Sequence, residues 1–119
     1  MDGIATYQEN TVNTQSKGRL IVMLYDGAIR FMKLAIIEME NKNYEAKGRY
    51  INRALDIINE LNVVLDMDAG GEIAYNLRQL YIFMNRHLSQ ANIKCDTLLV
   101  RDVIKIMETL NEGWKAITR

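Results

Sequence analysis

No proline interrupts the 119 residues of this chain. Proline kinks or ends a helix, so a chain without it can form long unbroken helices. Apolar residues recur at helical spacing from the first third of the sequence, starting with Leu20, Leu24, Ala28, Phe31 and Ala35. That spacing puts them on one helical face, and the alternation typical of strands is nowhere sustained. The sequence therefore predicts an all-α fold.

Three further stretches have the same periodicity. They run through Tyr44, Ile51, Ala54, Ile58, Leu61 and Leu65, then Ile73, Leu77, Leu80, Met84, Leu88 and Ala91, and finally Leu99, Val103, Met107, Leu110, Trp114 and Ile117. Short corners between them make consecutive helices antiparallel neighbours, which predicts an antiparallel up-down four-helix bundle. The first fifteen residues are rich in Thr, Asn and Gln. We expect a flexible or short-helical N-terminal segment (1–15) ahead of a helical bundle domain (16–119).

Two adjacent glycines, Gly70 and Gly71, separate the second and third stretches. A phosphate-binding loop would need a strand before the glycines and Lys-Ser or Lys-Thr after them, and the sequence has neither. A glycine in the left-handed conformation often ends a helix. Glu72 would then stand in the first turn of the next helix, where its charge is favourable. The pattern indicates a structural corner.

The composition argues against several classes of partner. Fifteen basic and fifteen acidic residues cancel, so no basic surplus indicates nucleic acid or anionic lipid. The apolar runs are too short to cross a bilayer, and the first residues lack the features of a signal peptide. The single cysteine, Cys95, fits a reducing compartment. We expect a cytoplasmic protein with no nucleic-acid partner and no membrane insertion.

Four-helix bundles often hold cofactors, but the required ligands are missing from this sequence. His87 is the only histidine, and Met84 precedes it by three positions, so the Glu-x-x-His pairs of a di-iron site are absent. A lone cysteine supplies neither haem attachment nor a zinc cluster. Cys95 and His87 are eight positions apart, about 12 Å along a continuous helix, which disfavours a nucleophile–base pair. We expect no enzyme activity, no catalytic residue, no metal and no cofactor.

The sequence also has more apolar residues than one stripe per helix requires. They are Ile21, Val22, Tyr25, Ile29, Met32, Ile36 and Met39 in the first stretch, Tyr50, Ile57 and Val64 in the second, and Tyr75 and Ile82 in the third. Such residues can be the interior of a central helix together with scattered surface positions. They can equally line a groove that accepts the amphipathic helices of a partner. The pattern alone leaves both interpretations open.

Two apolar residues stand in the N-terminal segment. Ile4 and Tyr7 are three positions apart, so a single helical turn would bring them to the same side. On a loose polar tether they can enter an apolar groove and leave when a partner arrives. The alternative is a disordered terminus in which the two residues are incidental.

Several blocks of the sequence occur together in one known family. Leu20–Ala28 reads LIVMLYDGA, Ala54–Ile58 reads ALDII and Gly70–Ala74 reads GGEIA, with Asp96 and Trp114 further along. In their order and spacing these blocks resemble the FliS family, the cytoplasmic flagellar export chaperones for flagellin. The resemblance covers residues 4 to 117. It is specific because the first and third blocks occur together.

The resemblance implies a bundle without a catalytic site that binds the disordered C-terminal segment of flagellin. Such binding prevents premature polymerisation and keeps flagellin competent for the flagellar export apparatus. The expected client-binding residues are Ile4, Tyr7, Ile21, Tyr25, Tyr50, Ile57, Val64, Tyr75 and Ile82. One departure from the family is Lys17, which follows Ser16 where a proline is usual. The alternative function is a structural or regulatory bundle that self-associates through the same apolar residues.

Overall fold

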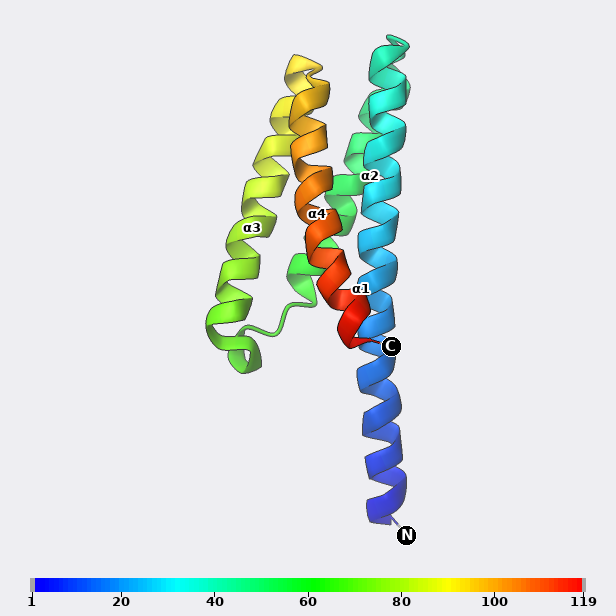
Figure 1. Cartoon of the computed structure of the whole chain (residues 1–119), viewed down its shortest axis with the longest axis vertical. Coiled ribbons are helices and arrows are strands. Elements are labelled where there is room, and N and C mark those ends of the chain that lie inside the picture. Colours follow the sequence, from blue (N-terminus) through cyan, green and yellow to red (C-terminus); the bar gives the residue numbers. More distant parts are fainter. Residues whose placement is uncertain (1, 119) are drawn as a thin grey trace.

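The computed structural model describes the backbone of residues 2–118 and the side chains of residues 17–118. The described backbone forms four helices: α1 (Asp2–Glu40), α2 (Tyr44–Val63), α3 (Met67–Lys94) and α4 (Thr97–Ile117) (Figure 1). No strand occurs in the part that is described. The predicted all-α four-helix bundle is thereby confirmed. The separation of residues 1–15 as a flexible segment stays a prediction.

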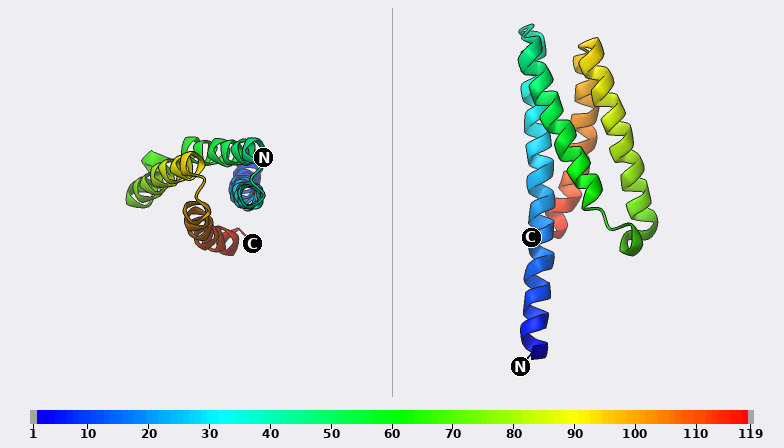
Figure 2. Two further views of the ribbon diagram at one scale, coloured as in Figure 1. Left: turned by 90° about the horizontal axis from the view of Figure 1, so that it is seen from above. Right: turned by 180° about the vertical axis from the view of Figure 1, so that it is seen from behind.

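The helices run alternately up and down, and each connection is short. α1 packs on α2 and α4, and α3 packs on the same two helices, so α1 and α3 face each other across a diagonal (Figure 2). Asp66 and Asp96 cap the starts of α3 and α4, since their carboxylates accept hydrogen bonds from main-chain N–H groups of the first turn. Lys42 and Cys95 have positive φ where α1 and α3 end. Local signals therefore fix the helix ends.

The corner predicted at the glycines is confirmed in kind but displaced along the chain. α2 already ends at Val63, and Asp66 starts α3 before the glycines. One helical turn follows, and Gly71 then breaks the helical geometry with φ 54° and ψ −131°. A side chain disfavours this backbone conformation, so glycine is required. The break redirects α3 along α2.

The core differs from the single stripe predicted for the first helix. The buried residues of α1 are Tyr25, Ala28, Ile29, Met32, Ala35, Ile36 and Met39. Leu20, by contrast, is 45% exposed. α1 needs two apolar faces because it packs on α2 on one side and on α4 on the other. Most of its apparent surplus is therefore interior.

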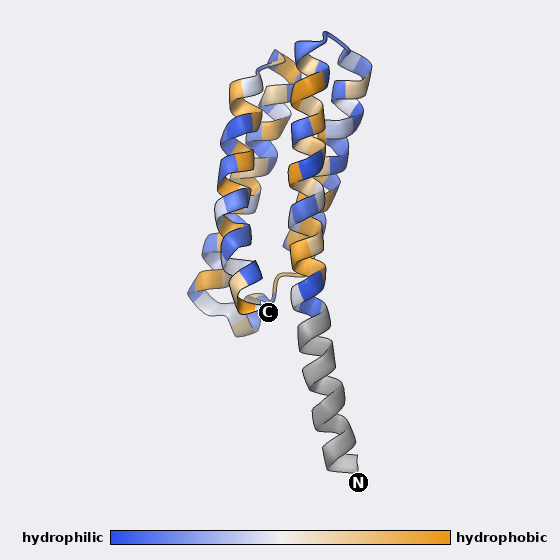
Figure 3. Ribbon diagram, turned by 45° about the vertical axis from the view of Figure 1, so that its right-hand side comes forward, coloured by the Kyte–Doolittle hydropathy of each residue, from blue (hydrophilic) through white to orange (hydrophobic). Residues whose placement is uncertain are grey.

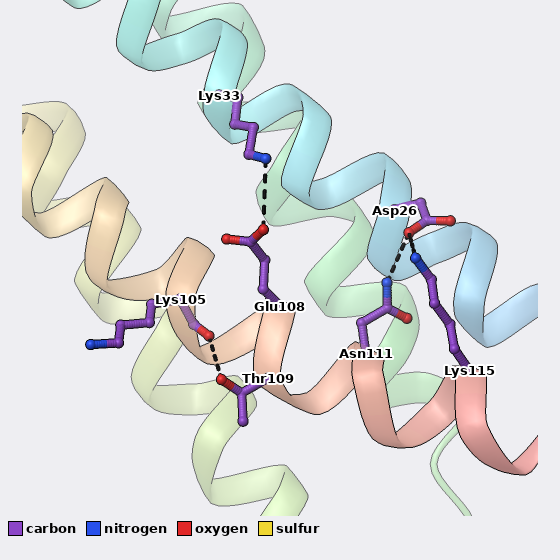
Figure 4. A network of polar contacts seen from close by, with 7 residues as sticks. All are labelled: Asp26, Lys33, Lys105, Glu108, Thr109, Asn111 and Lys115. Carbon is purple, nitrogen blue, oxygen red and sulfur yellow. Dashed lines mark hydrogen bonds and ion pairs between the residues drawn. The ribbon is translucent and has the colours of Figure 1, made fainter.

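The seam between α1 and α4 also carries polar contacts (Figure 4). Asn111 is buried and donates a hydrogen bond to Asp26, with 2.8 Å between Nδ2 and Oδ1. Lys115 contacts the same oxygen at 3.3 Å, and Lys33 lies 3.7 Å from Glu108. The ion pairs are half-exposed and contribute little to stability. Within the described residues, Asn111 Oδ1 is buried without a hydrogen-bond partner.

Candidate functional site

A cavity of about 200 Å³ opens at the end of the bundle where α2 connects to α3. We call it the basal pocket. Its lining comprises Ile21, Leu61, Val64, Leu65, Asp66, Gly70, Ile73, Ala74, Leu77, Tyr81 and Trp114. The one charged residue in this lining, Asp66, already accepts hydrogen bonds from the N–H groups of Asp68 and Ala69. The pocket is therefore suited to an apolar side chain.

A pair of tyrosines lies beneath the basal pocket. The hydroxyl oxygens of Tyr25 and Tyr81 are 2.7 Å apart and both rings are buried. Trp114 packs on Tyr25 with 6.3 Å between ring centroids. Burial raises the pKa of the Tyr25 hydroxyl, an effect that hydrogen bonding partly offsets. Burial also raises the pKa of Tyr81, and its hydrogen bond with Tyr25 raises it further. Both hydroxyls stay protonated at neutral pH.

Two of the predicted binding residues meet in the basal pocket. Ile21 is half-buried on α1, and Val64, 38% exposed, lies just beyond α2. Tyr25, however, is completely buried in this structure, and its role in client binding stays a prediction. Its ring fills the space between α1, α3 and α4, where it touches Tyr81 and Trp114.

The line of apolar residues on α2 mostly faces α1. Tyr50 stacks on Phe31, with 6.2 Å between ring centroids. A Cβ at Gly27 would lie 3.4 Å from Ile57 Cδ1, so the glycine allows α2 to approach. The side chains of Tyr50 and Ile57 are both half-buried. Of the three apolar residues spaced seven apart, Tyr50 and Ile57 thus pack against α1. Only Val64 lines the basal pocket.

The other predicted residues are separate from the basal pocket. Tyr75 is 57% exposed on α3, and Ile82 lies further along α3 at the edge of a second hollow. Ile4 and Tyr7 lie outside the residues whose side chains are described. A binding role for all these residues stays a prediction.

Sequence reasoning missed one exposed apolar residue of the pocket. Ile73 was placed in the core stripe of the third helix, yet it is 74% exposed at the pocket mouth. Ile117, assigned to the fourth core stripe, is exposed as well. Figure 3 shows apolar residues at this end of the bundle, on the connection between α2 and α3 and in neighbouring turns. The signal was available, because apolar residues flank the glycine corner on both sides.

The titratable side chains of His87 and Cys95 have other surroundings than a metal site in the described structure. Among the described residues no cluster of three His, Cys, Asp or Glu side chains is placed to hold a metal ion. His87 Nε2 instead lies 3.0 Å from Asp102 Oδ2, and its ring stacks on Phe83. Cys95 is a free, half-buried thiol at the end of α3. In the described part of the chain, every helix is too short or too polar to span a membrane.

Comparison with known proteins identifies the family. The whole chain, residues 1–119, matches the family described as "Flagellar protein FliS". It is 38% identical over 109 residues to the flagellar secretion chaperone FliS of Bacillus subtilis, covering 92% of this chain and 80% of that protein. With FliS of Salmonella typhimurium it shares 39% identity over 111 residues, or 92% and 82% of the two chains. The secretion chaperone FliSB of Pseudomonas aeruginosa is 33% identical, and the match covers 99% of this chain and 97% of that protein. The chain therefore belongs to the FliS family of flagellar secretion chaperones.

Proposed function

We propose that this chain is a cytoplasmic export chaperone whose client is flagellin. It binds the disordered C-terminal segment of flagellin, prevents that segment from polymerising and keeps it competent for the flagellar export apparatus. The observation that carries this proposal is the match to secretion chaperones over nearly the whole chain. The basal pocket supports it, because an apolar hollow with one internally bonded charge suits an apolar client side chain.

The pocket is small compared with a cofactor site. Pockets for small molecules usually enclose about 300–1,000 Å³, whereas the basal pocket holds about 200 Å³. That volume suits a single anchoring side chain of a longer segment. Exposed apolar residues around it, Ile73 and Val64, extend the surface that a client can cover. Burial of such residues stabilises a complex by about 25 cal/mol per Å² of apolar area.

Co-purification tests this function. The chain is expressed with the flagellin of the same cell, either full-length or without its C-terminal segment. We expect the full-length flagellin to co-purify and the truncated one to be lost. Added chaperone should also delay the assembly of flagellin filaments, measured by light scattering. Equal recovery of both flagellins would place the binding site elsewhere, and recovery of neither would refute flagellin as the client.

Self-association is the competing function for the same surface. Val64 and Ile73 are exposed aliphatic side chains at the basal pocket, and such residues can also join two copies. Multi-angle light scattering of the purified chain distinguishes the two cases. A chaperone without client should be a monomer that becomes a one-to-one complex with flagellin. A stable dimer that persists when flagellin is added would favour the alternative.

A further inference from the structure

Ion pairs recur at a fixed interval along the seam between α1 and α4. They join Asp26 to Lys115 at 3.3 Å, Lys33 to Glu108 at 3.7 Å, and Glu40 to Arg101 at 3.2 Å. Successive partners are seven residues, or almost two helical turns, apart on each helix. We call these six residues the charge ladder. Elsewhere in the described structure no Lys or Arg forms an ion pair with a carboxylate on another helix.

The sign of the charge alternates from one step of the charge ladder to the next. On α1 the charges run negative, positive, negative from Asp26 to Glu40, and the partners on α4 carry the opposite charges. If α4 slipped by one step in either direction, Glu108 would face a carboxylate of α1. Lys33 would face a basic side chain of α4. Every contact between ladder charges in a slipped register is therefore repulsive.

The apolar residues of the same seam do not discriminate between these registers. Buried apolar side chains also stand seven residues apart, namely Tyr25, Met32 and Met39 on α1 and Val100 and Met107 on α4. A slip of one step would again place apolar side chains opposite apolar ones. A regular seven-residue pattern leaves the register of two helices open, and charged or buried polar residues then decide it.

The charge ladder lies on the seam that no turn constrains. Residues 41–43 join α1 directly to α2, and residues 95–96 join α3 directly to α4, so the bundle consists of two tight helical hairpins (Figure 1). The hairpins are linked through residues 64–66 and the first turn of α3, which Gly71 separates from the rest of that helix. Side chains must therefore set the position of one hairpin along the other.

We propose that the charge ladder sets the register of the α1–α2 hairpin against the α3–α4 hairpin. Both hairpins line the basal pocket, since Ile21 comes from the first and Trp114 from the second. A slip of one step would move one hairpin by about 10 Å and take Trp114 away from Tyr25. No member of the charge ladder lines the pocket. The ladder residues are thus positioning residues for it.

The buried Asn111 acts in the same direction. It is 3% exposed and donates its hydrogen bond to Asp26 on α1. A slip would remove this acceptor and leave the amide buried without a partner, which is unfavourable. A single buried asparagine is known to fix the register of paired helices. The polar contacts of the seam therefore all favour one register.

Setting the register does not require strong ion pairs. Half-exposed pairs contribute little to stability, so removing one costs little. Discrimination comes instead from the repulsion in the slipped registers. Loss of a pair and reversal of a pair therefore have different consequences, which separates this role from simple stabilisation.

The decisive variant exchanges the middle pair, Lys33→Glu with Glu108→Lys. Every pair of the ladder remains attractive in the native register, but each slipped contact becomes attractive as well. The neutral variant Lys33→Gln with Glu108→Gln removes the middle pair and gives no attraction in a slipped register. The matched control exchanges an ion pair within α2, Glu45→Arg with Arg49→Glu, away from the seam.

Spin labels attached at Asn41→Cys and Ala116→Cys, in a chain that also carries Cys95→Ser, report the register as a distance. Both positions are exposed, and they lie near opposite ends of the two hairpins. We expect one distance in the labelled parent chain, the neutral variant and the control. The exchange of the middle pair should add a second distance, displaced by about 10 Å.

A single native distance in the exchanged variant would overturn the inference. A second distance in the neutral variant or in the control would overturn it too, because slipping would then not depend on the order of the signs. Loss of the helical melting transition in the exchanged variant would also contradict it, since all its native pairs are attractive. The measurement needs no client, so its outcome is independent of the proposed function.

Discussion

The hydroxyl groups of Tyr25 and Tyr81 meet 2.7 Å apart in the interior, one from α1 and the other from α3. These two helices lie on a diagonal of the bundle and share no seam. The bond is therefore a direct link across the core, directly under the basal pocket. Because both rings are buried, neither hydroxyl can exchange its partner for bulk water at low cost.

The two hydroxyls should behave as one unit in a double-mutant cycle. Tyr25→Phe or Tyr81→Phe alone removes one partner and leaves the other hydroxyl buried and unpaired. Each is expected to lower the free energy of unfolding by about 1–3 kcal/mol. The double variant leaves no unpaired hydroxyl and should cost less than the sum of the two. Urea denaturation measures all four proteins, and strictly additive losses would contradict the link.

The same pair predicts a loss of stability in alkaline solution. Burial raises the pKa of both tyrosines above their usual 10. Below pH 10 the tyrosines are protonated in both the folded and the unfolded chain, so their contribution is complete. Above pH 10 the unfolded chain releases these protons first, which favours unfolding by up to about 1.4 kcal/mol per pH unit and tyrosine. The Tyr25→Phe, Tyr81→Phe double variant should lose less stability than the unmodified chain between pH 10 and 11.5.

Two glycines should respond to alanine in opposite directions. Gly71 has a positive φ that a side chain disfavours, so Gly71→Ala is expected to cost about 1–3 kcal/mol. Gly48 lies inside α2, and a Cβ there would meet no atom within 4 Å. Gly48→Ala should therefore stabilise the bundle by about 0.5–1 kcal/mol. Thermal melting of both variants checks the pair, and a stabilising Gly71→Ala would show that the break in α3 is dispensable.

The sequence was informative wherever a local rule decides the structure. Helical periodicity and the glycine corner were both predicted because each depends on neighbouring residues. The assignment of helix faces succeeded less well. α1 is apolar nearly all round, and periodicity cannot tell which face meets α2 or α4, so it left open whether Tyr25, which is buried, belongs to the core or to a binding surface. The basal pocket joins Ile21, Ile73 and Trp114, which only the tertiary fold brings together.

An exposed residue at the basal pocket should affect binding without affecting folding. Ile73 is 74% exposed at the pocket mouth, and Ile93, 78% exposed on the same helix, lies outside the pocket. Ile73→Ser should raise the Kd for the flagellin C-terminal peptide about 10-fold, because an apolar contact is lost. Ile93→Ser is the matched control and should bind normally. Equal effects of both substitutions would mean that the pocket is not the anchor site.

The N-terminal residues are expected to compete with the client for the apolar surface. They join the bundle beside the basal pocket, since Ile21 already lines its wall. If Ile4 and Tyr7 occupy the surface for part of the time, the apparent client affinity falls in proportion to that fraction. Occupation also shields the surface from a second copy. Deletion of residues 1–15 should therefore leave the bundle folded, tighten peptide binding and increase oligomerisation.

Calorimetry with the peptide and light scattering of the free chain measure the two effects. The full-length variant Ile4→Ser with Tyr7→Ser separates the two side chains from the length of the segment. On the competition hypothesis this variant reproduces both effects of the deletion, because the polar tether remains while its apolar residues are gone. A deletion that changes neither binding nor oligomeric state would reject the hypothesis. If the deletion has an effect that the double substitution lacks, that effect comes from the tether and not from the side chains of Ile4 and Tyr7.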